Sequence, residues 1–301
     1  MTPTILAVGA SGKFAGLVLP ELAKRGAKVR GLIRNASEAG EVRRHGASET
    51  AVGDLRDRTS LDAALLGIEA VFYISPATLP NEVEVGHGMV DAAKAAGVRR
   101  FVFSSLIHPV LGALSHHITK AAIEEAVLAS DMEFTFLHPA VFFQDITAAQ
   151  LADVRTSGVF SEPWSTGTRF SRVDYRDVAE VAAIALTEER LNYGTFELCA
   201  DGHPDRHDLA ALMAAVLGRK VKATRLSPPA SPKPPAGSNA EKEALKMAAM
   251  FDWYDRHGLV GNPLILHAIL GRPPRTLGAY LEELAAEAPP VVERAQLRRL
   301  A

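Results

Sequence analysis

The chain has very little cysteine: Cys199 is the only one among its 301 residues. A single cysteine excludes an intrachain disulfide and fits a reducing compartment. Residues 195–199 have the pattern of a strand, which favours a buried thiol. No stretch approaches the roughly 18 uninterrupted apolar residues of a membrane span, and the N-terminus lacks the charged start, apolar segment and cleavage site of a signal peptide. These absences predict a soluble, cytoplasmic protein without a membrane partner.

An excess of charge of one sign is also missing, because 33 basic and 35 acidic residues leave a formal net charge of -2. We therefore expect no nucleic-acid binding through a basic surface. No group of His, Cys and acidic residues has the spacing of metal ligands, so we expect no metal site. No Gly-x-Ser-x-Gly elbow indicates a hydrolase. Hydrophobic residues make up 48% of the chain, enough for one large domain or a domain with a smaller lobe.

Short apolar runs alternate with helical patterns along the first half of the chain. The runs are rich in β-branched and aromatic residues, as in strands that helices cover on both faces. Between them, apolar residues recur at helical spacing, for example in 17–23 and 89–96, and Gly26 and Gly97 stand where those helices would end. This alternation predicts a doubly wound, parallel α/β sheet of the Rossmann type. The runs occupy residues 5–8, 29–33, 50–52, 71–74, 101–103 and 134–137.

The pattern becomes less regular after Pro139. We expect a strand at 195–198. Residues 227–238 are rich in Pro, Ser and Ala, which predicts a surface loop or a flexible lid hinge. We infer a dinucleotide-binding core at 1–140 and a smaller, mostly helical substrate lobe at 141–301, interleaved with the last elements of the sheet. The helices expected in this half are 175–186, 207–217, 240–256 and 277–286.

A glycine-rich turn follows the first predicted strand and opens the first predicted helix. Gly9 lets the chain turn sharply, Gly12 lets the backbone approach a pyrophosphate, and the small Ala15 lets the helix pack closely on the strand. The helix N-terminus offers free N–H groups and a partial positive charge to phosphates. The turn therefore predicts a dinucleotide site, with candidate cofactor-binding residues Gly9, Ser11, Gly12, Lys13 and Phe14.

The second predicted strand ends in Arg34 rather than in the acid that usually holds the ribose 2′-hydroxyl of NAD. The planar guanidinium of arginine matches a 2′-phosphate, and Lys13 is placed to assist it. We therefore expect NADPH or NADP as the cofactor in preference to NADH. Residues that follow the third and fourth strands would approach the adenine and the ribose–nicotinamide side respectively, namely Gly53 and Asp54, then Ser75 and Pro76.

Three later segments, together with the turn, resemble the NmrA-like branch of the atypical short-chain dehydrogenases. Residues 134–143, Phe-Thr-Phe-Leu-His-Pro-Ala-Val-Phe-Phe, look like the strand of that family that enters its active-site loop. Residues 173–179, Val-Asp-Tyr-Arg-Asp-Val-Ala, are similar to its late helix start, and 258–276 resemble its C-terminal helical region. The resemblance implies either an NADPH-dependent reductase or a dinucleotide-binding regulator that senses redox state.

The chain departs from the dehydrogenase pattern at the catalytic tyrosine. Ordinary short-chain dehydrogenases use Tyr-x-x-x-Lys, in which the lysine holds the ribose and lowers the pKa of the proton-donating tyrosine. Here Lys120 is in place, whereas His116 occupies the tyrosine position. Either His116 is a substitute acid, since imidazole titrates near neutral pH, or the acid is lost and Lys120 only anchors the ribose. By the same resemblance Ser105 is a candidate catalytic serine, and Ser104 and Pro139 are candidate cofactor contacts.

The main hypothesis is an NADPH-dependent oxidoreductase that transfers hydride to a small, apolar carbonyl, quinone, imine or enone. Its alternative is a non-catalytic NADP(H) sensor, and a redox-neutral isomerase or lyase is a third option. We expect a monomer or a homodimer that acts on a small molecule. For each candidate substrate contact, a structural role in the core or at a strand end is the competing interpretation. These candidates are His138, Phe142, Phe143 and Trp164.

Overall fold

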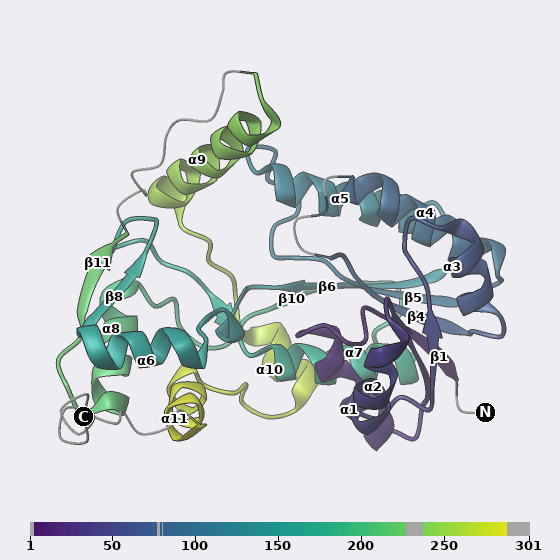
Figure 1. The fold of residues 1–301 in the computed structure, drawn as a ribbon, viewed down its shortest axis with the longest axis horizontal. Coiled ribbons are helices and arrows are strands. Elements are labelled where there is room, and N and C mark those ends of the chain that lie inside the picture. Colours follow the sequence, from purple (N-terminus) through teal and green to yellow (C-terminus); the bar gives the residue numbers. More distant parts are fainter. Residues whose placement is uncertain (1–2, 77–78, 80, 227–236, 288–301) are drawn as a thin grey trace, which may run out of the picture.

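The computed structural model describes residues 3–76, 79, 81–226 and 237–287. Seven parallel strands form a large sheet in the order β10-β6-β5-β4-β1-β2-β3 (Figure 1). Helices cover both faces of this sheet, so the predicted doubly wound fold is confirmed. The strands are β1 (Thr4–Val8), β2 (Lys28–Ile33), β3 (Glu49–Val52), β4 (Ala70–Ile74), β5 (Arg100–Ser104), β6 (Glu133–Pro139) and β10 (Gly194–Leu198).

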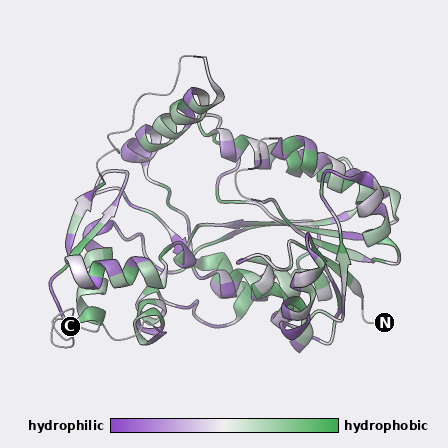
Figure 2. Cartoon of the chain, in the orientation of Figure 1, coloured by the Kyte–Doolittle hydropathy of each residue, from purple (hydrophilic) through white to green (hydrophobic). Residues whose placement is uncertain are grey.

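The central strands are buried because their apolar residues face helices on both sides. In β1, residues 5–8 are at most 1% exposed, and Figure 2 shows that much of the large sheet is hydrophobic. Val8 lies opposite Leu32 in the parallel pair of β1 and β2, so the carboxyl ends of these strands meet at one edge of the sheet. Ligands of open α/β sheets bind at this edge.

Two groups of helices form the outer layers (Figure 1). On one face lie α1 (Ala15–Lys24), α2 (Ala39–Arg44), α7 (Tyr175–Thr187) and α10 (Leu264–Leu270). On the other face lie α3 (Arg58–Leu65), α4 (Glu82–Ala95) and α5 (Ser115–Leu128). After β3 the chain returns across the sheet, and β4 pairs with the opposite side of β1. The resulting change of direction between β1 and β4 opens a crevice at the carboxyl edge.

The second half of the chain adds a smaller lobe. Its core packs α6 (Ala148–Ser157), α8 (Arg206–Leu217) and α11 (Leu277–Glu287) together. It also contains a two-stranded parallel sheet of β8 (Val159–Glu162) and β11 (Lys222–Arg225), which the sequence did not predict because each strand is stabilised by its distant partner. A second short pair joins β7 (Val141–Phe142) to β9 (Arg172–Val173). Helix α9 (Asn239–His257) lies on the same side of the large sheet as α5 (Figure 1).

The helices predicted at 175–186, 207–217, 240–256 and 277–286 are confirmed, with no end shifted by more than one residue. Most of the predicted loop, 227–236, lies outside the described residues. Two single turns of 3-10 helix complete the list of elements, η1 (Ala36–Glu38) and η2 (Phe143–Asp145). Within the described part of the chain, none of the helices combines the length and apolarity that crossing a membrane requires.

Candidate cofactor and active site

A cavity of about 480 Å³ lies at the carboxyl edge of the sheet, where the strand order changes direction. It is bounded by the glycine-rich turn and by the ends of β2, β3 and β4. Of the thirteen candidate cofactor residues named from the sequence, ten line it; Ser104, Lys120 and Pro139 are not among its lining residues. The ten are Gly9, Ser11, Gly12, Lys13, Phe14, Arg34, Gly53, Asp54, Ser75 and Pro76.

The glycine-rich turn has the backbone geometry that a pyrophosphate needs. Gly9 has φ +69°, in the region that favours glycine. A Cβ on Gly12 would lie 3.0 Å from the Gly9 carbonyl oxygen, and the Gly12 N–H already donates to that oxygen. A side chain at position 12 would therefore distort the turn as well as obstruct an approaching phosphate. Ala15, the first residue of α1, is 2% exposed, so the helix packs tightly behind the turn.

Two arginines reach the cavity from different strand ends. Arg34 follows β2 and is exposed. Arg56 is held by Asp54, with Nη2 2.7 Å from Oδ2, and this pairing lowers the pKa of Asp54 to about 2. Because Asp54 already pairs with Arg56, Arg34 is the more available of these two cations for a bound anion. The sequence reasoning did not select Arg56, which has no motif of its own.

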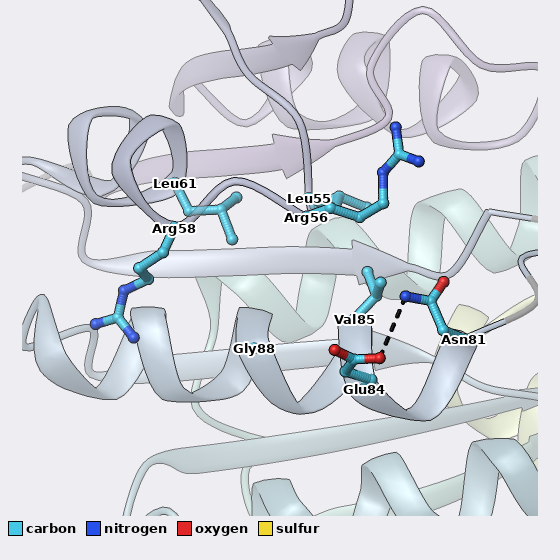
Figure 3. A pocket seen from close by; sticks show the side chains of 8 residues that line it. All are labelled: Leu55, Arg56, Arg58, Leu61, Asn81, Glu84, Val85 and Gly88. Carbon is cyan, nitrogen blue, oxygen red and sulfur yellow. Dashed lines mark hydrogen bonds between the residues drawn. The ribbon is translucent and has the colours of Figure 1, made fainter.

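A second cavity, of about 200 Å³, adjoins the first between α3 and α4 and shares Leu55 and Arg56 with it. Figure 3 shows the guanidinium groups of Arg56 and Arg58 pointing away from each other. Asn81 donates to Glu84 at 3.4 Å across its rim. The remaining lining is apolar, and the shared Leu55 and Arg56 make this space a continuation of the larger cavity.

An acidic side chain also reaches the glycine-rich turn. The Ser11 hydroxyl donates to Glu38 of η1 at 2.7 Å, and this hydrogen bond, with one from Asn35, lowers the pKa of Glu38. The sequence reasoning considered only the end of the second predicted strand, at Arg34, and therefore missed Glu38, four residues later. An ionised carboxylate at this place opposes a 2′-phosphate and favours a ribose hydroxyl.

Lys13 extends from the turn toward the lobe. Its amine donates to the carbonyl oxygen of Gln144 in η2, and the buried Gln144 amide donates to Asp174 at 2.7 Å. In this arrangement Lys13 connects the turn to the segment after β6 and does not accompany Arg34. The sequence placed Lys13 in the turn but carried no signal for its partner.

The candidate catalytic residues on α5 are engaged with α4. The Lys120 amine forms an ion pair with Glu82, and both side chains are about seven-eighths buried, with exposed fractions of 14% and 13%. Burial lowers the pKa of Lys120, and the charge of Glu82 opposes this shift. Burial, followed by the positive charge of Lys120, lowers the pKa of His116. At neutral pH this imidazole is therefore neutral.

A carboxylate connects two further candidates. Glu124, one helical turn after Lys120, accepts a hydrogen bond from the Ser105 hydroxyl and one from His138 Nε2 at 2.8 Å. The structure thus brings Ser105 and His138 together through a residue that sequence reasoning missed, although its i+4 spacing from Lys120 was a usable signal. Ser104 lies elsewhere, because its hydroxyl bonds to that of Tyr175, at 2.9 Å, in the buried core.

The aromatic candidates occupy three environments. Phe142 is half-buried and packs against Phe14 of the turn, with ring centroids 4.6 Å apart. Phe143 is 2% exposed and lies in the lobe core against Tyr280. Trp164 is half-buried among the rings of the lobe. Phe142 is thus the aromatic candidate that lies beside the dinucleotide cavity, whereas Phe143 has the structural role that was its alternative.

Comparison with known proteins identifies the family. A model of the NmrA-like family matches residues 1–284. The chain belongs to the NmrA-like family. This NmrA-like protein is 29% identical over 288 residues to the NAD(P)H azoreductase of Xenophilus azovorans, a match that covers 94% of this chain and 98% of the relative. Quinone oxidoreductase 2 of Escherichia coli is 26% identical over 228 residues, or 74% of this chain and 78% of the relative.

Solved structures agree with this assignment of the fold. The triphenylmethane reductase of Citrobacter sp. superposes on this NmrA-like protein with a TM-score of 0.81 at 22% identity, covering 94% of this chain and 99% of the other. The Escherichia coli NADPH-dependent quinone oxidoreductase QOR2, in complex with NADPH, gives a TM-score of 0.80 at 23% identity, with 93% and 99% covered. At these identities the similarity establishes the shared fold.

Proposed function

We propose that this chain is an NADPH-dependent reductase that transfers hydride to a small, apolar carbonyl, quinone, imine or enone. The observation that carries the proposal is the cavity of about 480 Å³ that runs along the glycine-rich turn and has Arg34 at its edge. The names of the azoreductase and quinone reductase relatives support a reductase of this kind. We further propose a cytoplasmic monomer or homodimer.

The residues present fit NADPH. The positive φ of Gly9 and the absence of a Cβ at Gly12 leave backbone room for a pyrophosphate, and helix α1 begins directly behind them. Arg34 lines the cavity and would supply a cation for the 2′-phosphate, whereas the opposing Glu38 is not among the lining residues. When bound, NADPH supplies the hydride, and the protein contributes position and proton transfer.

Lys120 and Ser105 would act beside the nicotinamide. The Lys120 amine, now held by Glu82, is suited to bind the ribose hydroxyls while keeping this carboxylate as a second partner. The Ser105 proton is committed to Glu124, which leaves the serine oxygen to accept rather than donate a hydrogen bond. A reduced carbonyl oxygen therefore needs its proton from another residue. His116 is the candidate, because it lies on the same face of α5 as Lys120, four residues earlier.

The first experiment follows NADPH consumption, by the absorbance of the reduced nicotinamide, against a panel of quinones, enones, imines and aldehydes. We expect Lys120→Ala to abolish turnover of the best acceptor. Lys94→Ala is the matched control, because Lys94 on α4 is exposed and pairs with Asp131. Tight NADPH binding without turnover of any panel member, or full turnover by Lys120→Ala, would contradict the proposal.

A redox sensor is the second candidate function. It is favoured by the engagement of both Lys120 and Ser105 with carboxylates, together with the missing tyrosine at position 116. A sensor must bind the two cofactor forms with different affinities, since equal affinity shifts no equilibrium. Titration with NADPH and NADP⁺ tests this requirement, and equal dissociation constants would rule out redox sensing.

A further inference from the structure

Helix α9 brings a tyrosine beside His116, the residue that replaces the catalytic tyrosine of the dehydrogenase pattern. The Tyr254 hydroxyl lies 3.4 Å from Nε2 of His116, across 138 residues of sequence. The distance is long for a hydrogen bond, but such contacts often tighten only when substrate and cofactor are bound. Tyr254 is 7% exposed, so few water molecules compete with His116 for its hydroxyl, although solvent still reaches the side chain.

Aromatic neighbours fix the ring of Tyr254. Trp164 and Phe170 meet it edge to face, with centroid distances of 5.9 and 5.3 Å. Trp253 packs beside it at 6.0 Å. Edge-to-face pairs of this kind favour a defined ring orientation. The cluster therefore holds the hydroxyl toward α5, and this is a role for Trp164 other than contact with substrate.

The surroundings determine which atoms carry protons. Burial raises the pKa of Tyr254 to about 12, so the phenol keeps its proton at neutral pH. His116 is neutral, for the reasons given above, and has Lys120, Glu82 and His117 as its titratable neighbours. A phenol that donates to Nε2 leaves the imidazole proton on Nδ1. The pair is thus a protonated phenol joined to an imidazole whose second nitrogen is a donor.

We propose that Tyr254 passes a proton to the substrate through His116, so that α9 supplies the phenol that α5 lacks. The proposal rests on the reductase function proposed above. As a carbonyl carbon accepts hydride, the electron pair of its π bond moves to oxygen, which takes the proton from Nδ1 of His116. Nε2 takes the phenol proton, and solvent then reprotonates the phenolate. The charge of Lys120 acts on His116, the middle member of the relay, and opposes a positive charge on its ring.

The test compares kcat of Tyr254→Phe, His116→Gln and the double variant on an aldehyde and on a quinone. General acid catalysis typically contributes about 10²–10⁴-fold. We expect each single variant to lose about 10²-fold in kcat on the aldehyde, and the double variant to lose no more, because the two residues act as one unit. The loss on the quinone should be smaller, since a reduced quinone tolerates negative charge on oxygen. The Kd for NADPH should stay within about twofold, which also verifies folding.

Tyr193→Phe is the matched control, because Tyr193 is 65% exposed. It directly precedes the amino end of β10, whereas the cofactor cavity lies at the carboxyl ends of the strands. Full aldehyde turnover by Tyr254→Phe, or losses that multiply in the double variant, would overturn the relay. If Tyr254→Phe impairs folding because Tyr254 is buried, His116→Gln still tests the relay, since His116 is partly exposed.

Nitrogen NMR of His116 separates failure of the relay from failure of the proposed function. We expect the Nδ1–H tautomer in the wild type and a mixture of tautomers in Tyr254→Phe. If the wild type turns over and His116 has the same tautomer population in the wild type and in Tyr254→Phe, the relay is overturned but the reductase function is not. A wild type that binds NADPH but reduces neither acceptor would overturn the reductase function, and the proton transfer with it.

Discussion

Replacement of Arg34 by alanine should change cofactor choice more than cofactor affinity in general. A hydrogen bond to a charged group contributes about 1.5–3 kcal/mol, and the exposure of Arg34 places its contribution at the lower end. We therefore expect the Kd for NADPH to rise about tenfold, which corresponds to about 1.4 kcal/mol. The Kd for NADH, which has no 2′-phosphate, should change less than about twofold.

Fluorescence titration with each cofactor measures the ratio of the Kd for NADH to the Kd for NADPH. Arg56→Ala is the control, because Arg56 lines the same cavity but is already paired with Asp54. Glu38→Gln should shift the ratio in the opposite direction, since it removes a negative charge beside Ser11. Equal loss of NADPH and NADH affinity in Arg34→Ala, or loss of NADPH preference in Arg56→Ala instead, would refute the assignment of Arg34 to the 2′-phosphate.

Three further predictions concern the turn and the stability of the fold. Gly12→Ala should weaken NADPH binding at least tenfold in the same titration, because its Cβ would lie 3.0 Å from the Gly9 carbonyl oxygen; unchanged affinity would exclude close backbone contact with the pyrophosphate. Asp177→Asn should lower the free energy of unfolding, measured by urea denaturation, by about 3 kcal/mol. The reason is that the carboxylate is fully buried and holds both Arg272 and Arg275. A change below about 1 kcal/mol would show these contacts to be dispensable. Burial lowers the pKa of His117 from 6.5 to about 4, so between these pH values the unfolded chain binds a proton that the folded protein does not. The free energy of unfolding should therefore fall by up to ~3 kcal/mol as the pH drops from 6.5 to 4. His117→Phe should reduce this pH dependence, and an identical slope in both proteins would contradict the assignment of the effect to His117.

The first half of the fold could be predicted because its signals are local. Each apolar run of three to five residues became a strand of the large sheet. The central strands are buried on both faces and need no partner-specific pattern, whereas Val52 of the edge strand β3 is exposed. The glycine-rich turn is equally local, because a positive φ at Gly9 and the missing Cβ at Gly12 are properties of single positions. The sequence therefore predicted ten of the residues that line the cofactor cavity.

The partners of Lys120 and His116 could not be predicted, because they come from distant elements. Glu82 reaches Lys120 from the start of α4, and Tyr254 reaches His116 from a helix more than a hundred residues later. Neither acid nor phenol lies in a motif, so their spacing along the chain carries no information. The four-residue strands β8 and β11 were missed for the same reason, since each is stabilised by pairing with the other across the lobe.

The sequence by itself determined the parallel sheet, the glycine-rich turn, the cation at the end of β2 and the replacement of tyrosine by histidine at position 116. Tertiary structure alone decided the protonation of that histidine, because burial and the charge of Lys120 act only in the folded protein. It also decided that Glu124 joins Ser105 to His138. Local backbone chemistry is encoded residue by residue, whereas the reactivity of a side chain depends on the groups that folding brings beside it.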